Sequence, residues 1–265
     1  MSPRHLRRSE AWMISRRLLA QVLIGLLPVT AGARAAETIA VASTRPDVTL
    51  PLLVETPVEP RAVVLLFAGG NGGVRFASNA PTTYSGNFLV RARGEFGANG
   101  IATAVVGASS DRTAPDWLTD TFRTSAEHAH DIGAAVEVLR ARFQRPVWLV
   151  GTSRGTLSAA AAGLQLGLRI DGVVLTAGLN SIKTLEIDRF EVPVLLVHHE
   201  RDTCRVTDYR DLRQVTSKLR APRREVLTFR GGNSEGPACE AMAFHGFNGI
   251  EAEVIRAIAL WIAPH

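Results

Sequence analysis

One serine in the sequence has the spacing expected of a nucleophile. The motif G-x-S-x-G spans residues 151–155, directly after the apolar run 147–150 and at the start of a small-residue stretch, 154–168, that is typical of a helix. A strand that turns at once into a helix leaves no room for side chains at the two glycines, and it presents the central hydroxyl above the strand end. The pattern predicts that Ser153 is a nucleophile, with a tight turn that does no chemistry as the alternative.

A serine hydroxyl becomes a strong nucleophile only when a base takes its proton and an acid orients that base. Asp202 follows the apolar run 194–197, and His245 lies in a loop before the last predicted helix. Asp202 is a candidate for the acid and His245 for the base. Glu200 and, further along the chain, Asp208 are alternative acids.

Histidines elsewhere in the chain allow a different interpretation of the same region. The residue types that bind zinc occur together here, as His198, His199, Glu200 and Asp202. His128 and His130 add to this set, but they lie two residues apart on a predicted helix and do not share a face. We expect no metal and no cofactor, and a role for His198 and His199 in shaping the strand end.

A glycine-rich segment, residues 69–73, follows the apolar run 62–67. Such a loop could bind a nucleotide phosphate. However, no Lys-Ser/Thr pair follows it, and the sequence contains no G-x-G-x-x-G motif. A nucleotide site is therefore not expected.

Apolar runs alternate with amphipathic stretches along the chain. The predicted strands are 38–41 and 48–54, forming an opening antiparallel hairpin, then 62–67, 101–106, 147–150, 173–175, 194–197 and 225–229. The predicted helices are 119–142, 154–168, 206–220 and 250–262. Continuous β-branched and leucine runs indicate strands buried on both faces, and their alternation with helices indicates a parallel sheet. The site should lie at the carboxyl ends of the strands.

Together, the serine turn, the glycine segment and the strand order resemble the α/β-hydrolase superfamily over residues 45–265. The resemblance implies an α/β fold with a mostly parallel central sheet, flanked by helices in three layers, as one domain over residues 36–265. It also implies a triad in the chain order Ser153, Asp202, His245.

The same resemblance implies an oxyanion hole, a pair of N–H groups that bind the negative oxygen of a tetrahedral intermediate. One donor would be the N–H of Arg154, and the other would come from Gly69 or Gly70. The common family loop begins His-Gly, whereas this sequence has Phe67-Ala68, so the choice between the two glycines stays open.

The expected activity is that of a serine hydrolase that cleaves carboxylic esters through an acyl-enzyme. A serine peptidase of the same fold and a non-catalytic binding module that kept the fold are the alternatives. The 15 residues from 178 to 192 are too few for a folded lid, so we expect an open site and a small-molecule or extended ester substrate. The aromatic candidates for lining it are Tyr84, Phe88, Trp117 and Phe122.

The two cysteines of the chain, Cys204 and Cys239, lie close in sequence to the predicted acid and base. We predict that they form a disulfide. A bridge closing 35 positions would stabilise the fold by roughly 3–4 kcal/mol and hold the two loops in register.

Residues 1–35 resemble a secretory signal peptide, with an arginine-rich start, an apolar run over 18–29 and an Ala33-Arg34-Ala35 processing site. Ser15-Arg16-Arg17 fits a twin-arginine signal, which predicts a bacterial periplasmic or secreted protein without a stable membrane span after processing. Residues 1–35 contain six arginines and one glutamate, so their net charge of +5 equals the net charge of the whole chain. The rest is neutral, so nucleic acid is not an expected partner.

Overall fold

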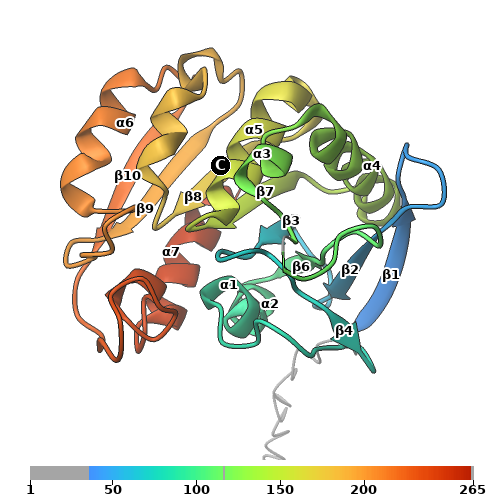
Figure 1. Ribbon diagram of the computed structural model, residues 1–265, viewed down its shortest axis with the longest axis horizontal. Helices are drawn as coiled ribbons and strands as arrows, with labels where there is room; N and C mark the ends of the chain where they lie inside the picture. The colour runs from blue at the N-terminus through green and yellow to red at the C-terminus, as the bar shows by residue number, and fades with distance from the viewer. Residues whose placement is uncertain (1–35, 116, 264–265) are drawn as a thin grey trace, which may run out of the picture. The chain divides into compact units, whose positions relative to one another are not determined.

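The computed structural model describes residues 36–263 apart from residue 116, and the predicted signal peptide lies outside these residues (Figure 1). Eight of the described strands form one sheet in the order β1-β2-β6-β3-β7-β8-β9-β10. They are β1 (Glu37–Ala42), β2 (Thr49–Glu55), β3 (Ala62–Phe67), β6 (Ile101–Val106), β7 (Val147–Thr152), β8 (Gly172–Thr176), β9 (Val194–His199) and β10 (Arg224–Phe229). A separate small hairpin joins β4 (Phe76–Ala77) to β5 (Ala80–Pro81).

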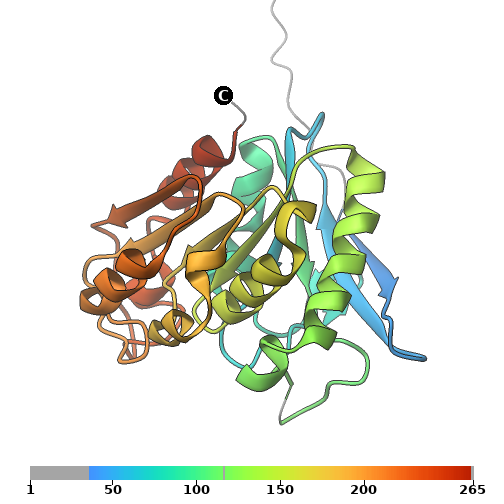
Figure 2. The same cartoon turned by 90° about the horizontal axis from the view of Figure 1, so that it is seen from above.

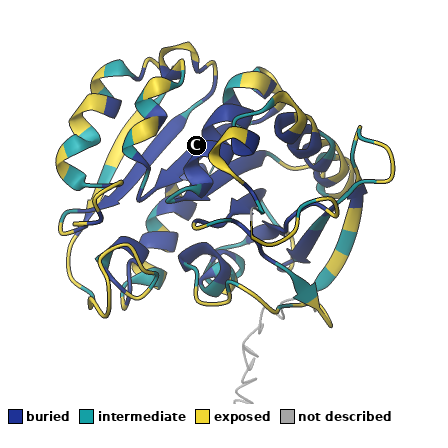
Figure 3. Ribbon diagram, in the orientation of Figure 1, coloured by how far each residue is buried: buried dark blue, intermediate teal, exposed yellow. Residues whose placement is uncertain are grey.

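The sheet is antiparallel only where β2 pairs with β1 and β6, and parallel from β6 to β10. Every residue of β3, β6, β7, β8 and β9 is buried, which is why these strands read as continuous apolar runs (Figure 3). The predicted mostly parallel sheet and its opening hairpin are confirmed.

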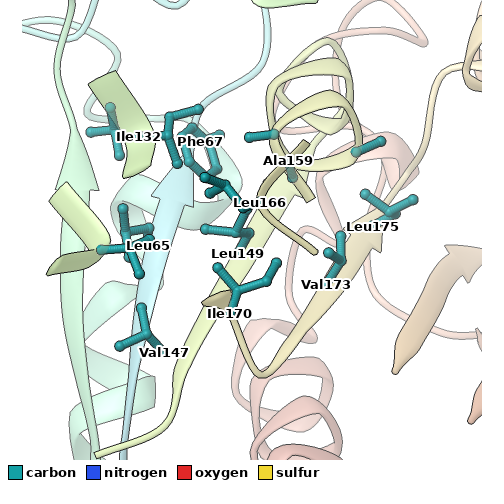
Figure 4. Packing of buried hydrophobic residues seen from close by; sticks show 14 of the residues in the cluster. Leu65, Phe67, Ile132, Val147, Leu149, Ala159, Leu166, Ile170, Val173 and Leu175 are labelled. Carbon is teal, nitrogen blue, oxygen red and sulfur yellow. The ribbon is translucent and has the colours of Figure 1, made fainter. Parts of the chain in front are cut away.

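Helices cover both faces of this sheet (Figure 2). Their bounds are α1 (Phe88–Arg91), α2 (Arg93–Ala98), α3 (Asp120–Arg123), α4 (Ala126–Phe143), α5 (Gly155–Leu166), α6 (Leu212–Lys218) and α7 (Glu251–Ile262). On one face α4 and α5 pack on alternate strand residues, as Ile132 and Leu166 do around Leu65 and Leu149 (Figure 4). On the other face α1, α2 and α7 pack on the intervening residues. The three layers follow from the two-residue side-chain period of the strands.

Two of the predicted helices are wrong in extent. A single helix over 119–142 was expected, but α3 ends at Arg123 and α4 begins at Ala126. The Ser125 side chain accepts a hydrogen bond from the His128 N–H, so α4 has its own N-terminal cap. The predicted helix 206–220 is also shorter, because the 3₁₀ turn Tyr209–Asp211 precedes α6.

The segment between β8 and β9 contains two short 3₁₀ turns, Asn180–Thr184 and Ile187–Arg189. This agrees with the expectation that no folded lid is inserted there. Among the described residues, no helix is long and apolar enough to cross a bilayer.

Candidate active site

Ser153 lies in a strained turn between β7 and α5. Its φ of +52° is in the left-handed region, which a non-glycine residue adopts at a cost. A Cβ at Gly151 would lie 2.4 Å from the Gly155 oxygen, and one at Gly155 would lie 2.1 Å from the Phe67 oxygen. Only glycine fits at either position, so the strand–turn–helix predicted from the motif is present and Ser153 sits at its apex.

Asp202 and His245 meet across the loops that follow β9 and β10. His245 Nδ1 donates to Asp202 Oδ2 at 2.9 Å, and the side chain of Asp202 is fully buried. The Cys204 N–H donates to the other carboxylate oxygen at 2.9 Å. With Nδ1 protonated, a neutral His245 has Nε2 free to accept a proton.

Thr207 joins the same group, although nothing in the sequence pattern singled it out. Its hydroxyl lies 3.0 Å from Asp202 Oδ2 and 3.1 Å from His245 Nδ1, and the residue is fully buried. Its carbonyl oxygen accepts a 2.7 Å hydrogen bond from His198 Nε2. Thr207 thus fixes the acid and His198 in one network.

The environment keeps Asp202 ionised. Burial alone would raise its pKa, but hydrogen bonding to His198 and His245 outweighs burial and holds the pKa of Asp202 well below its usual range. His198 Nε2 lies 3.3 Å from Asp202 Oδ2. An ionised carboxylate beside an imidazole can stabilise the imidazolium that forms when the ring takes a proton.

The alternative acids point elsewhere. Glu200 pairs with Arg230 at 2.6 Å, and Asp208 pairs with Arg210 at 2.5 Å. Among the described residues, His245 hydrogen-bonds to Asp202 and Thr207 and to neither of these carboxylates.

The two histidines at the end of β9 are engaged with the backbone. His199 Nε2 donates to the Gly231 oxygen at 3.0 Å, its Nδ1 accepts from the Arg201 N–H, and its ring stacks on Phe244 at 4.6 Å. Burial lowers the pKa of His199. No group of three or more His, Cys, Asp or Glu side chains among the described residues is arranged to hold a metal ion.

Ser153 and His245 line one pocket of about 350 Å³. Its other lining residues are Gly69, Gly70, Tyr84, Gly86, Asn87, Phe88, Thr152, Cys239, Glu240, Ala241 and Gly246. Two of the four aromatic candidates, Tyr84 and Phe88, are therefore in the pocket. The other two are not among its lining residues: Phe122 packs on His128 in the core, and Trp117 packs against Gly73.

The glycine loop after β3 lies directly against the serine. A Cβ at Gly69 would be 2.9 Å from the Ser153 Cβ and 3.5 Å from its Oγ. Within the described part of the chain, the N–H groups of Gly69, Gly70 and Arg154 have no protein acceptor. Unpaired N–H groups beside a nucleophile can bind a developing oxyanion.

The predicted disulfide between Cys204 and Cys239 is present. Cys204 is buried next to Asp202, while Cys239 lines the pocket. The bridge therefore joins the loop of Asp202 to the segment that leads to His245.

No family model and no curated protein sequence matches the chain. Solved structures do. Dienelactone hydrolase from Anabaena variabilis is similar over 86% of this chain and 97% of its own, with a TM-score of 0.59 and 15% identity. XC6422 from Xanthomonas campestris, described as an α/β serine hydrolase without a lid, matches 84% of this chain and 94% of its own, with a TM-score of 0.56 and 14% identity.

Est1E from Butyrivibrio proteoclasticus, solved with ferulic acid bound, matches 84% of this chain and 98% of its own, with a TM-score of 0.57 and 14% identity. The chain has the α/β-hydrolase fold. At these identities the likeness shows the fold alone.

Proposed function

We propose that the protein is a serine hydrolase that cleaves carboxylic esters through an acyl-enzyme. The observation that carries this proposal is the buried Asp202–His245 hydrogen bond at the edge of the pocket that contains Ser153. A buried, ionised carboxylate behind an imidazole serves to orient a base, and the strained serine turn exposes a hydroxyl for attack. A binding module would need neither feature.

In the proposed reaction His245 Nε2 removes the proton from Ser153 as its Oγ attacks the ester carbonyl. The Arg154 N–H and that of Gly69 or Gly70 bind the oxyanion of the tetrahedral intermediate. His245 then gives the proton to the leaving alcohol, and an acyl-Ser153 ester remains. Water, activated by the same imidazole, releases the acid and restores the serine.

Esters are proposed as substrates rather than peptides for two reasons. The pocket of about 350 Å³ suits one small acyl group, and a 17-residue connection between β8 and β9, residues 177–193, adds no separate recognition domain. Two of the fold neighbours named above are described as hydrolases, and the third, Est1E, was solved with ferulic acid, an aromatic acid.

The test is labelling of the purified protein with a fluorophosphonate probe, which reacts with an activated serine. Wild-type protein should label, and the Ser153→Ala variant and a heat-denatured sample should not. A panel of p-nitrophenyl esters and matched p-nitroanilides then compares ester with amide cleavage. Failure of folded wild type to label would refute the serine hydrolase, and faster anilide cleavage would favour a peptidase.

We also propose that the protein acts outside the cytoplasm of a bacterium, after export through residues 1–35. The Cys204–Cys239 disulfide is compatible with this location, because such bonds persist in oxidising compartments. Cell fractionation of a bacterium that expresses the full chain, with and without Arg16→Lys and Arg17→Lys, tests it. Export of both proteins in equal amounts would contradict the twin-arginine route.

A further inference from the structure

Arg123, the last residue of α3, is a buried cation. Only 1% of the residue is exposed, and within the described part of the chain its hydrogen bonds all go to neutral oxygens. Burial lowers its pKa to about 10, so it stays charged at neutral pH. A buried charge without a carboxylate partner is costly, and it calls for an explanation from the groups that it contacts.

Two of these groups belong to the glycine loop beside Ser153. One guanidinium nitrogen, Nη2, donates to the Ala68 oxygen at 3.2 Å and to the Gly70 oxygen at 3.3 Å. The first carbonyl belongs to the peptide whose N–H is that of Gly69. In a trans peptide the C=O and N–H point in opposite directions, so Arg123 holds the Gly69 N–H pointing away from itself.

The second peptide is held at both ends. Its carbonyl, that of Gly70, accepts from Arg123, and its N–H, that of Asn71, donates to the Tyr84 hydroxyl at 3.3 Å. A Cβ at Gly72 would lie only 2.3 Å from Nη2, so the glycine there allows the guanidinium to reach the loop. Arg123 therefore holds the loop through its carbonyl oxygens, and Tyr84, which lines the pocket, holds it through the Asn71 N–H.

The other terminal nitrogen of the guanidinium contacts α5, the helix that follows Ser153. Nη1 donates to Ser158 Oγ on α5 at 2.9 Å, and His128 Nε2 lies 3.0 Å from the same oxygen. Burial and the nearby charge of Arg123 lower the pKa of His128 to about 3, so it is neutral and adds no second buried charge. One guanidinium therefore links α5 to the glycine loop.

We propose that Arg123 is a positioning residue for the oxyanion hole, because it bridges the Ala68 and Gly70 carbonyls and so directs the Gly69 N–H at the reacting oxygen. Its charge also polarises the Ala68–Gly69 peptide, which strengthens that N–H as a donor in a low-dielectric site. The inference rests on the proposed function and selects Gly69 over Gly70 as the second donor.

The experiment measures steady-state hydrolysis of a p-nitrophenyl ester by wild type, Arg123→Met, Arg123→Lys and Ser158→Ala. Arg223→Met is the matched control, because Arg223 also binds a backbone carbonyl, that of Trp261, at the other end of the sheet. The affinity of each variant for a trifluoromethyl ketone is also measured, because attack of Ser153 on the ketone carbonyl forms an oxyanion. Thermal unfolding reports whether each variant is folded.

We expect Arg123→Met to lower kcat by about 10²-fold with KM changed less than about threefold, since only the transition state uses the oxyanion donors. Ketone affinity should fall in parallel with kcat/KM. Arg123→Lys keeps a charge, but its single nitrogen cannot contact the loop carbonyls and Ser158 at the same time, so it should recover only part of the rate. Ser158→Ala should cost a few-fold, and Arg223→Met should leave both constants near wild type.

A folded Arg123→Met protein with kcat and ketone affinity within about threefold of wild type would overturn the proposal. Full activity of Arg123→Lys would overturn it as well, because a guanidinium that links the loop to Ser158 would then be unnecessary. If the methionine variant does not fold, the lysine variant decides: partial activity with ketone affinity reduced in parallel supports the proposal, and full activity overturns it. Wild type that neither labels nor hydrolyses esters would instead refute the proposed function itself.

Discussion

The two sides of Ser153 differ in the kind of chemical group that they present. On the side of β9 and β10, polar side chains contact one another directly: the titratable Asp202 and His245 and the hydroxyl of Thr207 form a buried hydrogen-bonded group beside a disulfide. On the side of β3, a glycine loop presents backbone N–H groups and is held by the guanidinium of Arg123.

The difference follows from what each side has to do. In the proposed reaction a proton moves on the first side, so its groups need matched protonation states and an ionised carboxylate. Only a charge must be stabilised on the second side, and fixed dipoles do that without moving. Changes on the first side should therefore affect chemistry more than folding, and changes at the glycines of the second should affect folding first.

The largest effect is expected on activity when the acid is neutralised. Asp202→Asn leaves the shape unchanged but no longer favours the Nδ1–H form of His245, so kcat should fall by about 10⁴-fold. Ester hydrolysis of the purified variant measures this. Glu200→Gln is the control, since Glu200 pairs with Arg230 outside the group and its loss should change kcat less than about threefold. Equal losses in the two variants would contradict the assignment of the acid.

The disulfide provides a way to loosen the acid–base side without removing its charges. The Cys204→Ser, Cys239→Ser double variant should lose roughly 3–4 kcal/mol of unfolding free energy, because the bond closes 35 positions of chain. Denaturant unfolding with and without a reductant measures it, and the reductant should affect only wild type. A double variant as stable as oxidised wild type would show that the bond does not constrain these loops.

On the other side, a methyl group at Gly155 should break the contact between the serine turn and the loop after β3. Its Cβ would meet the Phe67 oxygen at 2.1 Å, so Gly155→Ala should cost about 3 kcal/mol of unfolding free energy. The matched control is Gly97→Ala in α2, where a Cβ meets no atom within 4 Å and should slightly stabilise the helix. Similar stability of both variants would show that the turn tolerates side chains.

The sequence predicted the parts of the fold whose signal is local. The runs 62–67, 147–150 and 194–197 are continuous because their strands are buried on both faces, and they appear as β3, β7 and β9. The break at Ser125 was missed because Phe122 and Ala126 continue the helical spacing across it, while the cap depends on a single hydrogen bond.

For the site, types and chain order were enough to select Asp202 and His245, which the structure brings together. Thr207 and Arg123 carried no such signal. A lone threonine after an acid loop and an arginine in an amphipathic stretch are usually surface residues, and only the folded chain places them beside Asp202 and the glycine loop. Thr207 also contacts His245 and Arg123 contacts Ala68, both far away along the chain, so no local pattern could predict these roles.

The smallest expected effect is a pH dependence of stability that comes from His128. It tests whether Arg123 is the single buried charge on the side of β3. His128 has a pKa of about 3 in the folded protein, whereas an unfolded histidine titrates near about 6.5. Between these values the unfolded chain binds a proton that the folded protein does not. The free energy of unfolding should therefore fall as the pH falls, by at most about 1.4 kcal/mol per unit from this residue.

Denaturant unfolding of wild type, His128→Asn and His130→Asn between pH 7.5 and about pH 5 measures this slope above the range where carboxylates protonate. His128→Asn should flatten the dependence of unfolding free energy on pH. A change in the absolute stability of this variant does not matter, because only the slopes are compared. His130 is exposed on the same helix, so His130→Asn should keep the wild-type slope. An unchanged slope in His128→Asn would mean that His128 takes up its proton in the folded state, placing a second cation at the Ser158 hydroxyl that holds Arg123. The contrast between a titrating side and a fixed-dipole side of Ser153 would then fail.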